Sequence, residues 1–146
     1  MNNDFMHDNG WVAVALIASA IVVAVTLIIH IFVCWLLYTI SNRIPARFRL
    51  MDPGLVWLLL IPCFYMVWNF FVYPKLSRGF KAYFESVNDA TVGDCGLQIG
   101  TFYAVAVVCT LLPCVNYVAG PAAIVLLIVY LIKVNELSKK IPAGAT

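Results

Sequence analysis

The feature that most constrains this chain is a long apolar run close to its beginning. Residues 11–38 hold no Asp, Glu, Lys or Arg, and His30 is the only side chain there that could carry a charge near neutral pH. A helix rises ~1.5 Å per residue, so this run is longer than the ~30 Å hydrocarbon core of a bilayer. The run therefore predicts a membrane-spanning helix that is tilted or extends beyond the bilayer. The preceding residues, MNNDFMHDNG, contain no Lys or Arg, which argues against a cleaved signal peptide.

Composition indicates a chain that is solvated by lipid. Of the 146 residues, 64% are hydrophobic and 11% are charged, whereas soluble domains carry roughly 25% charged residues. So few charges cannot cover a water-facing surface, and the apolar residues are gathered in runs of helical length. We expect an all-α integral membrane protein.

Two further apolar regions complete the predicted architecture. One extends from residue 55 to residue 73 and is closed by Pro74, and the other covers residues 97–134. The second region would be ~57 Å long as one helix, which exceeds one span. Gly120-Pro121 in the stretch NYVAGP predicts a turn that divides it. We therefore predict a single domain over residues 1–146, built as a bundle of four transmembrane helices near 11–38, 54–73, 97–115 and 120–134.

The second of these helices leaves two topologies open. Residues 51–71 read MDPGLVWLLLIPCFYMVWNFF, with Pro62 in the middle. If the segment crosses as a helix bent at Pro62, the best orientation places both termini in the cytoplasm, with six basic residues inside and three outside. If the segment is re-entrant, the N-terminus lies outside and all nine basic residues lie inside. The charge count favours re-entry. The length of the segment favours crossing. Re-entrant backbone must also be shielded by protein, which a small chain provides poorly. Four spans are therefore the prediction.

The polar segment after Pro74 combines charge with apolar spacing. Three basic side chains recur there at intervals of three, among apolar side chains at helical spacing: Lys75, Arg78 and Lys81, with Leu76, Phe80 and Phe84. This pattern predicts an amphipathic helix whose basic residues lie at the lipid headgroups. The alternative is a simple extension of the preceding helix into water.

Small and polar side chains inside the apolar runs predict where helices touch. Gly96 and Gly100 form a GxxxG pattern, and Ala20 and Ala24 form a looser small-xxx-small pair; both permit close helix approach. The conspicuous polar groups near membrane depth are three amides: Asn69, Gln98 and Asn116. We expect these amides to hydrogen-bond between helices, and the alternative is that they line a pore in an oligomer.

The sequence offers one candidate for metal or haem ligation. His30 lies one helical turn from Cys34 on the same face, but the second histidine, His7, lies in the polar N-terminal tail. A histidine paired across a helix interface is the commoner role. The five cysteines include no CxxC, so we expect buried hydrophobes rather than a zinc site or a disulfide framework. We predict no cofactor and no metal.

Several short stretches carry a resemblance. The run PGLVWLLLIP at residues 53–62 is continued by VWNFFV at residues 67–72, and Leu-Pro-Cys at residues 112–114 precedes the ending YLIK at residues 130–133. In this order, from about Trp35 to Lys139, the chain resembles a family of small multi-pass bacterial integral membrane proteins. The resemblance implies this helical architecture and a location in the inner (cytoplasmic) membrane of a bacterial cell. It transfers no activity and no functional residue.

These observations favour a non-catalytic function. No acidic residue lies within an apolar run, which argues against an ion-coupled transporter or a proton pump, and no GxSxG, HExxH or P-loop motif occurs. We expect no enzyme, no catalytic residue and no nucleic-acid partner, because the basic residues are few and adjacent to apolar runs. The predicted partners are the lipid bilayer and either further copies of the chain or subunits of a larger membrane complex. The alternative function is a small oligomeric channel or pore.

Overall fold

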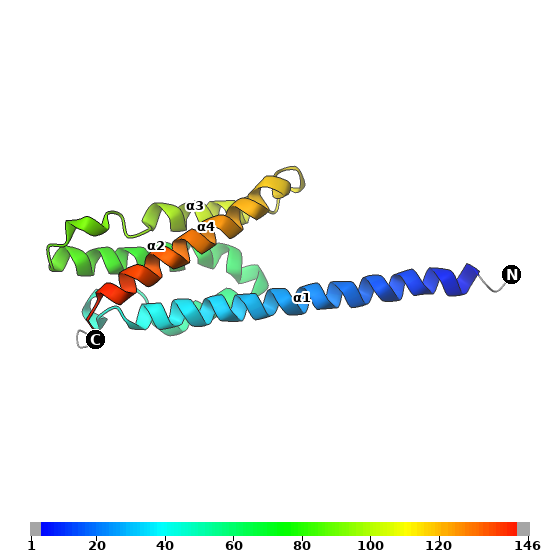
Figure 1. Cartoon of the computed structure of the whole chain (residues 1–146), viewed down its shortest axis with the longest axis horizontal. Coiled ribbons are helices and arrows are strands. Elements are labelled where there is room, and N and C mark those ends of the chain that lie inside the picture. The colour runs from blue at the N-terminus through cyan, green and yellow to red at the C-terminus, as the bar shows by residue number, and fades with distance from the viewer. Residues whose placement is uncertain (1–3, 143–146) are drawn as a thin grey trace. The chain divides into compact units, whose positions relative to one another are not determined.

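All regular secondary structure between Asp4 and Pro142 is helical, which confirms the predicted all-α class. The computed structural model describes residues 4–142, with side chains for residues 10–62, 64–89 and 91–142. The elements in chain order are α1 (Asp4–Asn42), η1 (Ala46–Phe48), η2 (Pro53–Leu60), α2 (Pro62–Ser86), η3 (Ala90–Val92), α3 (Leu97–Cys109) and α4 (Pro113–Lys140). Figure 1 labels the four α-helices. The η elements are short 3-10 helices.

The chain falls into two compact units, which we call the N-terminal unit (up to Val33) and the bundle unit (from Cys34). The N-terminal unit is the apolar first part of α1, and its side chains from Gly10 to Ile29 are exposed. Among the described residues, two helical segments, Gly10–Asn42 and Pro113–Lys140, are long and apolar enough to cross a membrane by length and composition. The assignment of all residues to one transmembrane domain stays a prediction.

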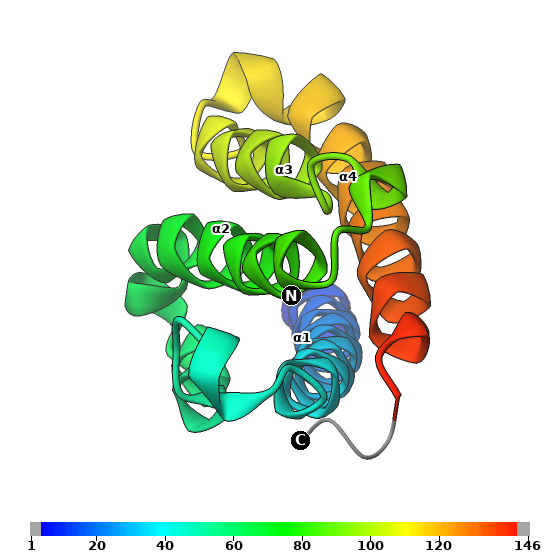
Figure 2. The ribbon, with the colours of Figure 1, turned by 90° about the vertical axis from the view of Figure 1, so that its left-hand side faces the viewer.

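The bundle unit is built around α2, which contacts α3, α4 and the three 3-10 helices η1, η2 and η3. The helices α2 and α3 are antiparallel, because Tyr65 meets Tyr103 while Tyr73, two turns later on α2, meets the earlier Gly100. The helix α4 returns antiparallel to α3 and crosses beside both helices, as Figure 2 shows. The last turns of α1 complete the core of this unit by burying Cys34, Leu37, Ile40 and Ser41.

The segment predicted as one bent helix over residues 54–73 is instead a hairpin. Its first arm is η2, whose N-terminus is capped by the Asp52 side chain accepting from the Gly54 N–H at 2.8 Å. The chain is extended at Ile61, and Pro62 starts α2, the second arm. A proline fits the first turn of a helix, but it disfavours helical backbone at the residue before it. The Trp68 indole N–H donates to the Leu55 carbonyl at 2.8 Å, which ties the two arms side by side.

The predicted break at Gly120-Pro121 is wrong. The helix α3 ends at Cys109, residues 110–112 make the turn, and α4 runs from Pro113 through Pro121 to Lys140. Pro113 acts as Pro62 does, because it holds Leu112 extended and starts the helix. Pro121 removes one backbone bond to the carbonyl of Tyr117, a defect that an apolar helix tolerates. In the same way α2 continues through Pro74 to Ser86, so residue 73 is not its end.

Candidate functional site

The interior of the bundle unit holds a group of aromatic and polar side chains that we call the tyrosine cluster: Tyr65, Tyr73 and Ser77 of α2, Tyr103 of α3 and Tyr130 of α4. The Tyr73 ring lies at its centre, with ring-centroid distances of 4.8 Å to Tyr103 and 5.0 Å to Tyr130. Both contacts are edge-on, the geometry that aromatic quadrupoles favour. Tyr73 and Tyr130 are both almost completely buried. The cluster therefore joins three helices through large apolar surfaces.

The hydroxyl groups of the cluster are paired with one another and with backbone. The Tyr130 hydroxyl donates to the Tyr73 carbonyl at 3.0 Å, and the Ser77 hydroxyl lies 3.1 Å from the same oxygen of Tyr130. The hydroxyls of Tyr65 and Tyr103 are 2.7 Å apart. Because an unpaired buried hydroxyl costs ~1–3 kcal/mol, these contacts allow polar side chains to remain in the interior. They also fix the register of α4 on α2.

Two glycines of the predicted GxxxG pattern provide the space for the Tyr130 ring. A Cβ placed on Gly100 would lie 2.9 Å from Tyr130 Cε2 and 3.0 Å from the Tyr73 Cβ, closer than carbon atoms approach. At Gly96 the same ring is 3.4 Å away, and the backbone φ of +82° is one that favours glycine. Gly96 is thus the residue before α3 rather than part of it, and Gly100 is the close contact within the helix.

Asn69 is a fully buried polar residue whose side chain makes no hydrogen bond to the described residues. It is 0% exposed, and neither its amide oxygen nor its amide nitrogen has a hydrogen-bond partner among the described residues. It lies one turn from Tyr65 and one turn from Tyr73 on the same face of α2. It therefore faces the interior of one copy of the chain, which does not favour the alternative that it lines a path between copies.

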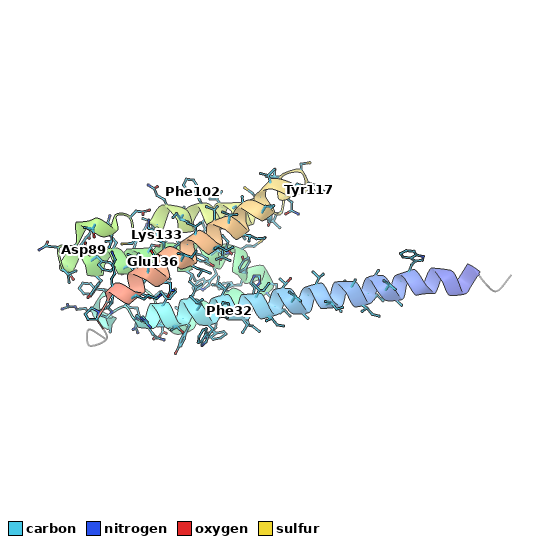
Figure 3. All side chains as sticks on the ribbon, viewed as in Figure 1. Phe32, Asp89, Phe102, Tyr117, Lys133 and Glu136 are labelled. Atoms are coloured by element: carbon cyan, nitrogen blue, oxygen red, sulfur yellow. The ribbon has the colours of Figure 1, made fainter. Side chains whose placement is uncertain are left out.

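An ion pair lies at the end of the bundle where α3 begins. The Asp94 carboxylate accepts from Lys133 Nζ at 2.8 Å and from the backbone N–H groups of Gly96 and Gln98, at 3.2 and 3.0 Å. The hydrogen bond from Lys133, followed by that from Gln98, lowers the pKa of Asp94 to about 2. The carboxylate thus caps the N-terminus of α3 and ties it to α4. Figure 3 labels Lys133 on α4 beside this end.

The structure separates the other residues that the sequence singled out. Ala20 and Ala24 are exposed on the N-terminal unit, Gln98 is exposed in the first turn of α3, and Asn116 is exposed in the first turn of α4. These amides do not meet Asn69 at one site. His30 Nδ1 lies 3.0 Å from the Thr26 carbonyl, one turn earlier on the same helix. No group of three or more His, Cys, Asp or Glu side chains is placed to hold a metal ion within the described part of the chain.

The three basic residues assigned to lipid headgroups lie on the second half of α2. Arg78 is exposed, the Lys75 ammonium lies 5.7 Å from the centre of the Phe71 ring, and Lys81 is 3.8 Å from Glu85 on the next turn. The segment is helical, as predicted, but it is a continuation of α2 rather than a separate helix. Their contact with headgroups stays a prediction.

The residues that organise this site were not predicted together. The sequence did not single out Tyr73, Ser77 or Tyr130 as members of a site. A signal exists in the sequence, because Tyr65, Asn69, Tyr73 and Ser77 recur every four residues and therefore form one face of a helix. The arrangement holds hydroxyls and an amide in a packed interior, which suits cohesion between helices. Comparisons with protein-family models, with curated proteins and with solved structures find no match to this chain.

Proposed function

We propose that this chain is a non-catalytic integral membrane protein, anchored by α1, that packs as a homo-oligomer or as a small accessory subunit of a larger membrane complex. The observation that carries the proposal is the exposure of the N-terminal unit. Every large apolar side chain from Trp11 to Phe32 is at least 45% exposed, around the whole circumference of the helix. A helix that is apolar on all sides is stable when lipid or other helices surround it.

The interior of the bundle unit supports a structural role rather than a catalytic one. Its hydroxyls are held by one another or by backbone carbonyls, as described for Tyr130, Ser77 and the Tyr65–Tyr103 pair. Such contacts join helices where lipid gives no hydrophobic drive for association. The bundle unit therefore serves as a rigid body, and α1 offers the surface on which partners dock.

Ala20 and Ala24 are the residues through which we expect α1 to approach a partner helix. They lie one turn apart on one face, and both are exposed in a single copy of the chain. Small side chains let two helix backbones come close enough for extensive van der Waals contact. Ala15 lies on the opposite face of the same helix, since each residue turns the helix by ~100°. It provides a matched control.

The test is native mass spectrometry of the full chain in a mild detergent, comparing the A20L/A24L double variant with A15L. A defined assembly, of this chain alone or with further subunits, that is lost in A20L/A24L and kept in A15L supports the proposal. A strictly monomeric wild-type chain contradicts it. A symmetric ring that conducts ions after reconstitution would replace it with the channel alternative.

A further inference from the structure

The basic residues of the bundle unit gather at one end. The Phe48 ring of η1 lies 5.8 Å from the Tyr83 ring, which brings the arginine-rich stretch 43–49 to the last turns of α2. At the same end Lys133 binds Asp94. The last turn of α4, which carries Lys139 and Lys140, lies at the same end of the unit as the end of α2, as Figure 1 shows. Asp89 and Tyr117, labelled in Figure 3, mark the charged end and the opposite end of the unit.

The opposite end is apolar at both of its turns. The first turn, at Ile61 and Pro62, joins η2 to α2, and the second, at residues 110–112, joins α3 to α4. Ile61 is 49% exposed, and Leu111 and Leu112 are 61% and 55% exposed. All nine Lys and Arg residues lie outside the stretches 50–74 and 97–132 that form these two hairpins. Exposed apolar turns without charge are suited to lipid and not to water.

The first hairpin is too short to cross a bilayer. Its descending arm, η2, has eight residues and a length of ~16 Å at the ~2.0 Å rise of a 3-10 helix. In its returning arm Lys75 lies thirteen residues after Pro62, or ~20 Å along the helix. Both lengths are well below the ~30 Å hydrocarbon core. The backbone at the turn is also paired, because the Ile61 N–H donates to the Leu58 carbonyl at 3.2 Å and the Ile61 carbonyl accepts from the Tyr65 N–H at 2.8 Å.

We infer that the bundle unit enters the membrane from one side only, with the η2–α2 hairpin re-entrant and the basic end bound to the anionic phospholipid headgroups of that leaflet. Its partner is thus an anionic lipid surface. From residue 34 onwards the chain has nine basic and five acidic residues, a net charge of +4, and Asp94 already holds Lys133. Arg43, Arg47, Arg78, Lys139 and Lys140 are exposed at this end. By the positive-inside rule this leaflet is the cytoplasmic one.

This inference rests on the membrane location in the proposed function, and a first arm of the experiment tests that location separately. The full chain is expressed in bacterial cells, and its membranes are washed with alkaline carbonate. A chain released by the wash overturns the proposed function itself. A chain that is retained allows the side of each segment to be measured.

The second arm measures sidedness in a variant that lacks the native cysteines. R47C and R78C flank the η2–α2 hairpin, and each is treated with a membrane-impermeant maleimide in right-side-out and inside-out vesicles. We expect both positions to react from the cytoplasmic side only. Reaction of the two positions from opposite sides would show that residues 53–73 cross, and would overturn the inference while leaving the membrane location intact.

The third arm measures lipid binding by native mass spectrometry with added phosphatidylglycerol or phosphatidylcholine. Each basic residue near an anionic surface changes the affinity about fivefold. We therefore expect phosphatidylglycerol to be preferred, and the exposed-site variant K139Q/K140Q to bind it about 25-fold more weakly. The control K139R/K140R keeps the charge and should bind like the wild type. Equal binding of the two lipids by the wild-type chain, or no loss in K139Q/K140Q, would contradict headgroup recognition.

Discussion

Replacing Gly100 by alanine should destabilise the bundle unit although alanine is the better helix former. The new Cβ would lie 2.9 Å from Tyr130 Cε2 and 3.0 Å from the Tyr73 Cβ. The Tyr130 ring cannot move away easily, because its hydroxyl is held by the Tyr73 carbonyl and Ser77. The Tyr73 Cβ is attached to the α2 backbone, so relief requires that two helices separate. Overpacking of this kind costs ~1–3 kcal/mol.

The matched control is G120A, because a Cβ on Gly120 would meet nothing closer than the Asn116 side-chain oxygen at 3.6 Å. Both variants gain the ~1 kcal/mol by which alanine exceeds glycine in a helix. The difference between them therefore isolates the clash, and we expect G100A to be less stable than G120A by ~1–3 kcal/mol. The assay is unfolding in mixed micelles with increasing SDS, followed by tryptophan fluorescence. Equal stability of the two variants would refute the packing of Tyr130 on α3.

Three further perturbations test other contacts by the same unfolding assay. Y130F removes a buried hydroxyl that holds two groups and should cost ~1–3 kcal/mol, whereas Y117F, at a side chain that is 87% exposed, should change nothing measurable. D94N should destabilise the start of α3 and abolish an acid transition of the wild type. The pKa of Asp94 is about 2 in the folded chain and 3.8 ordinarily, so the carboxylate stabilises the fold fully above pH 3.8 and loses this effect as the pH falls towards 2. If D94N keeps the acid transition of the wild type, the ion pair with Lys133 is excluded. N69L replaces a buried amide without a hydrogen-bond partner by an apolar side chain of similar size, so the free energy of unfolding should stay equal or rise. A loss above ~1 kcal/mol would show that the amide makes a hydrogen bond in the folded chain.

The helical class was predictable because it depends on composition and on the length of apolar runs. Residues 11–38 contain no Asp, Glu, Lys or Arg, and such a run is stable in lipid only where its backbone groups pair within the segment, as they do in a helix. The position of α3 was also predictable at its start, since Leu97 opens both the predicted and the observed helix. The GxxxG pattern predicts that another helix approaches closely at Gly100, but it does not identify Tyr130 as the side chain that packs there.

The role of each proline was not predictable from its neighbours alone. Pro62 and Pro113 start helices, whereas Pro74 and Pro121 lie inside them. Whether a proline starts a new helix depends on whether the segments before and after it can pack against each other. At Pro62 they do, because Trp68 of α2 donates a hydrogen bond to Leu55 of η2. Such a contact links residues thirteen apart and is a tertiary property.

The same limit explains why the tyrosine cluster was missed. Its face on α2 is visible as a repeat of four residues, but membrane helices also carry tyrosines at their interfaces with water. Only the pairing of α2 with α3 and α4 distinguishes a buried Tyr73 from an interfacial one. Sequence periodicity fixes which residues share a face, and packing decides what that face meets.

Whether residues 54–73 cross the membrane is decided by the sides on which Gly10, just before the apolar run of α1, and Pro142, after α4, lie. G10C and P142C, each introduced into the chain without native cysteines, are treated with an impermeant maleimide in vesicles of both orientations. If α1 crosses once and both hairpins enter from the cytoplasmic side, Gly10 lies outside and Pro142 lies inside, and the two variants react from opposite sides. If residues 54–73 cross as a fourth span, both variants react from the same side, and the single-sided insertion of the bundle unit is contradicted.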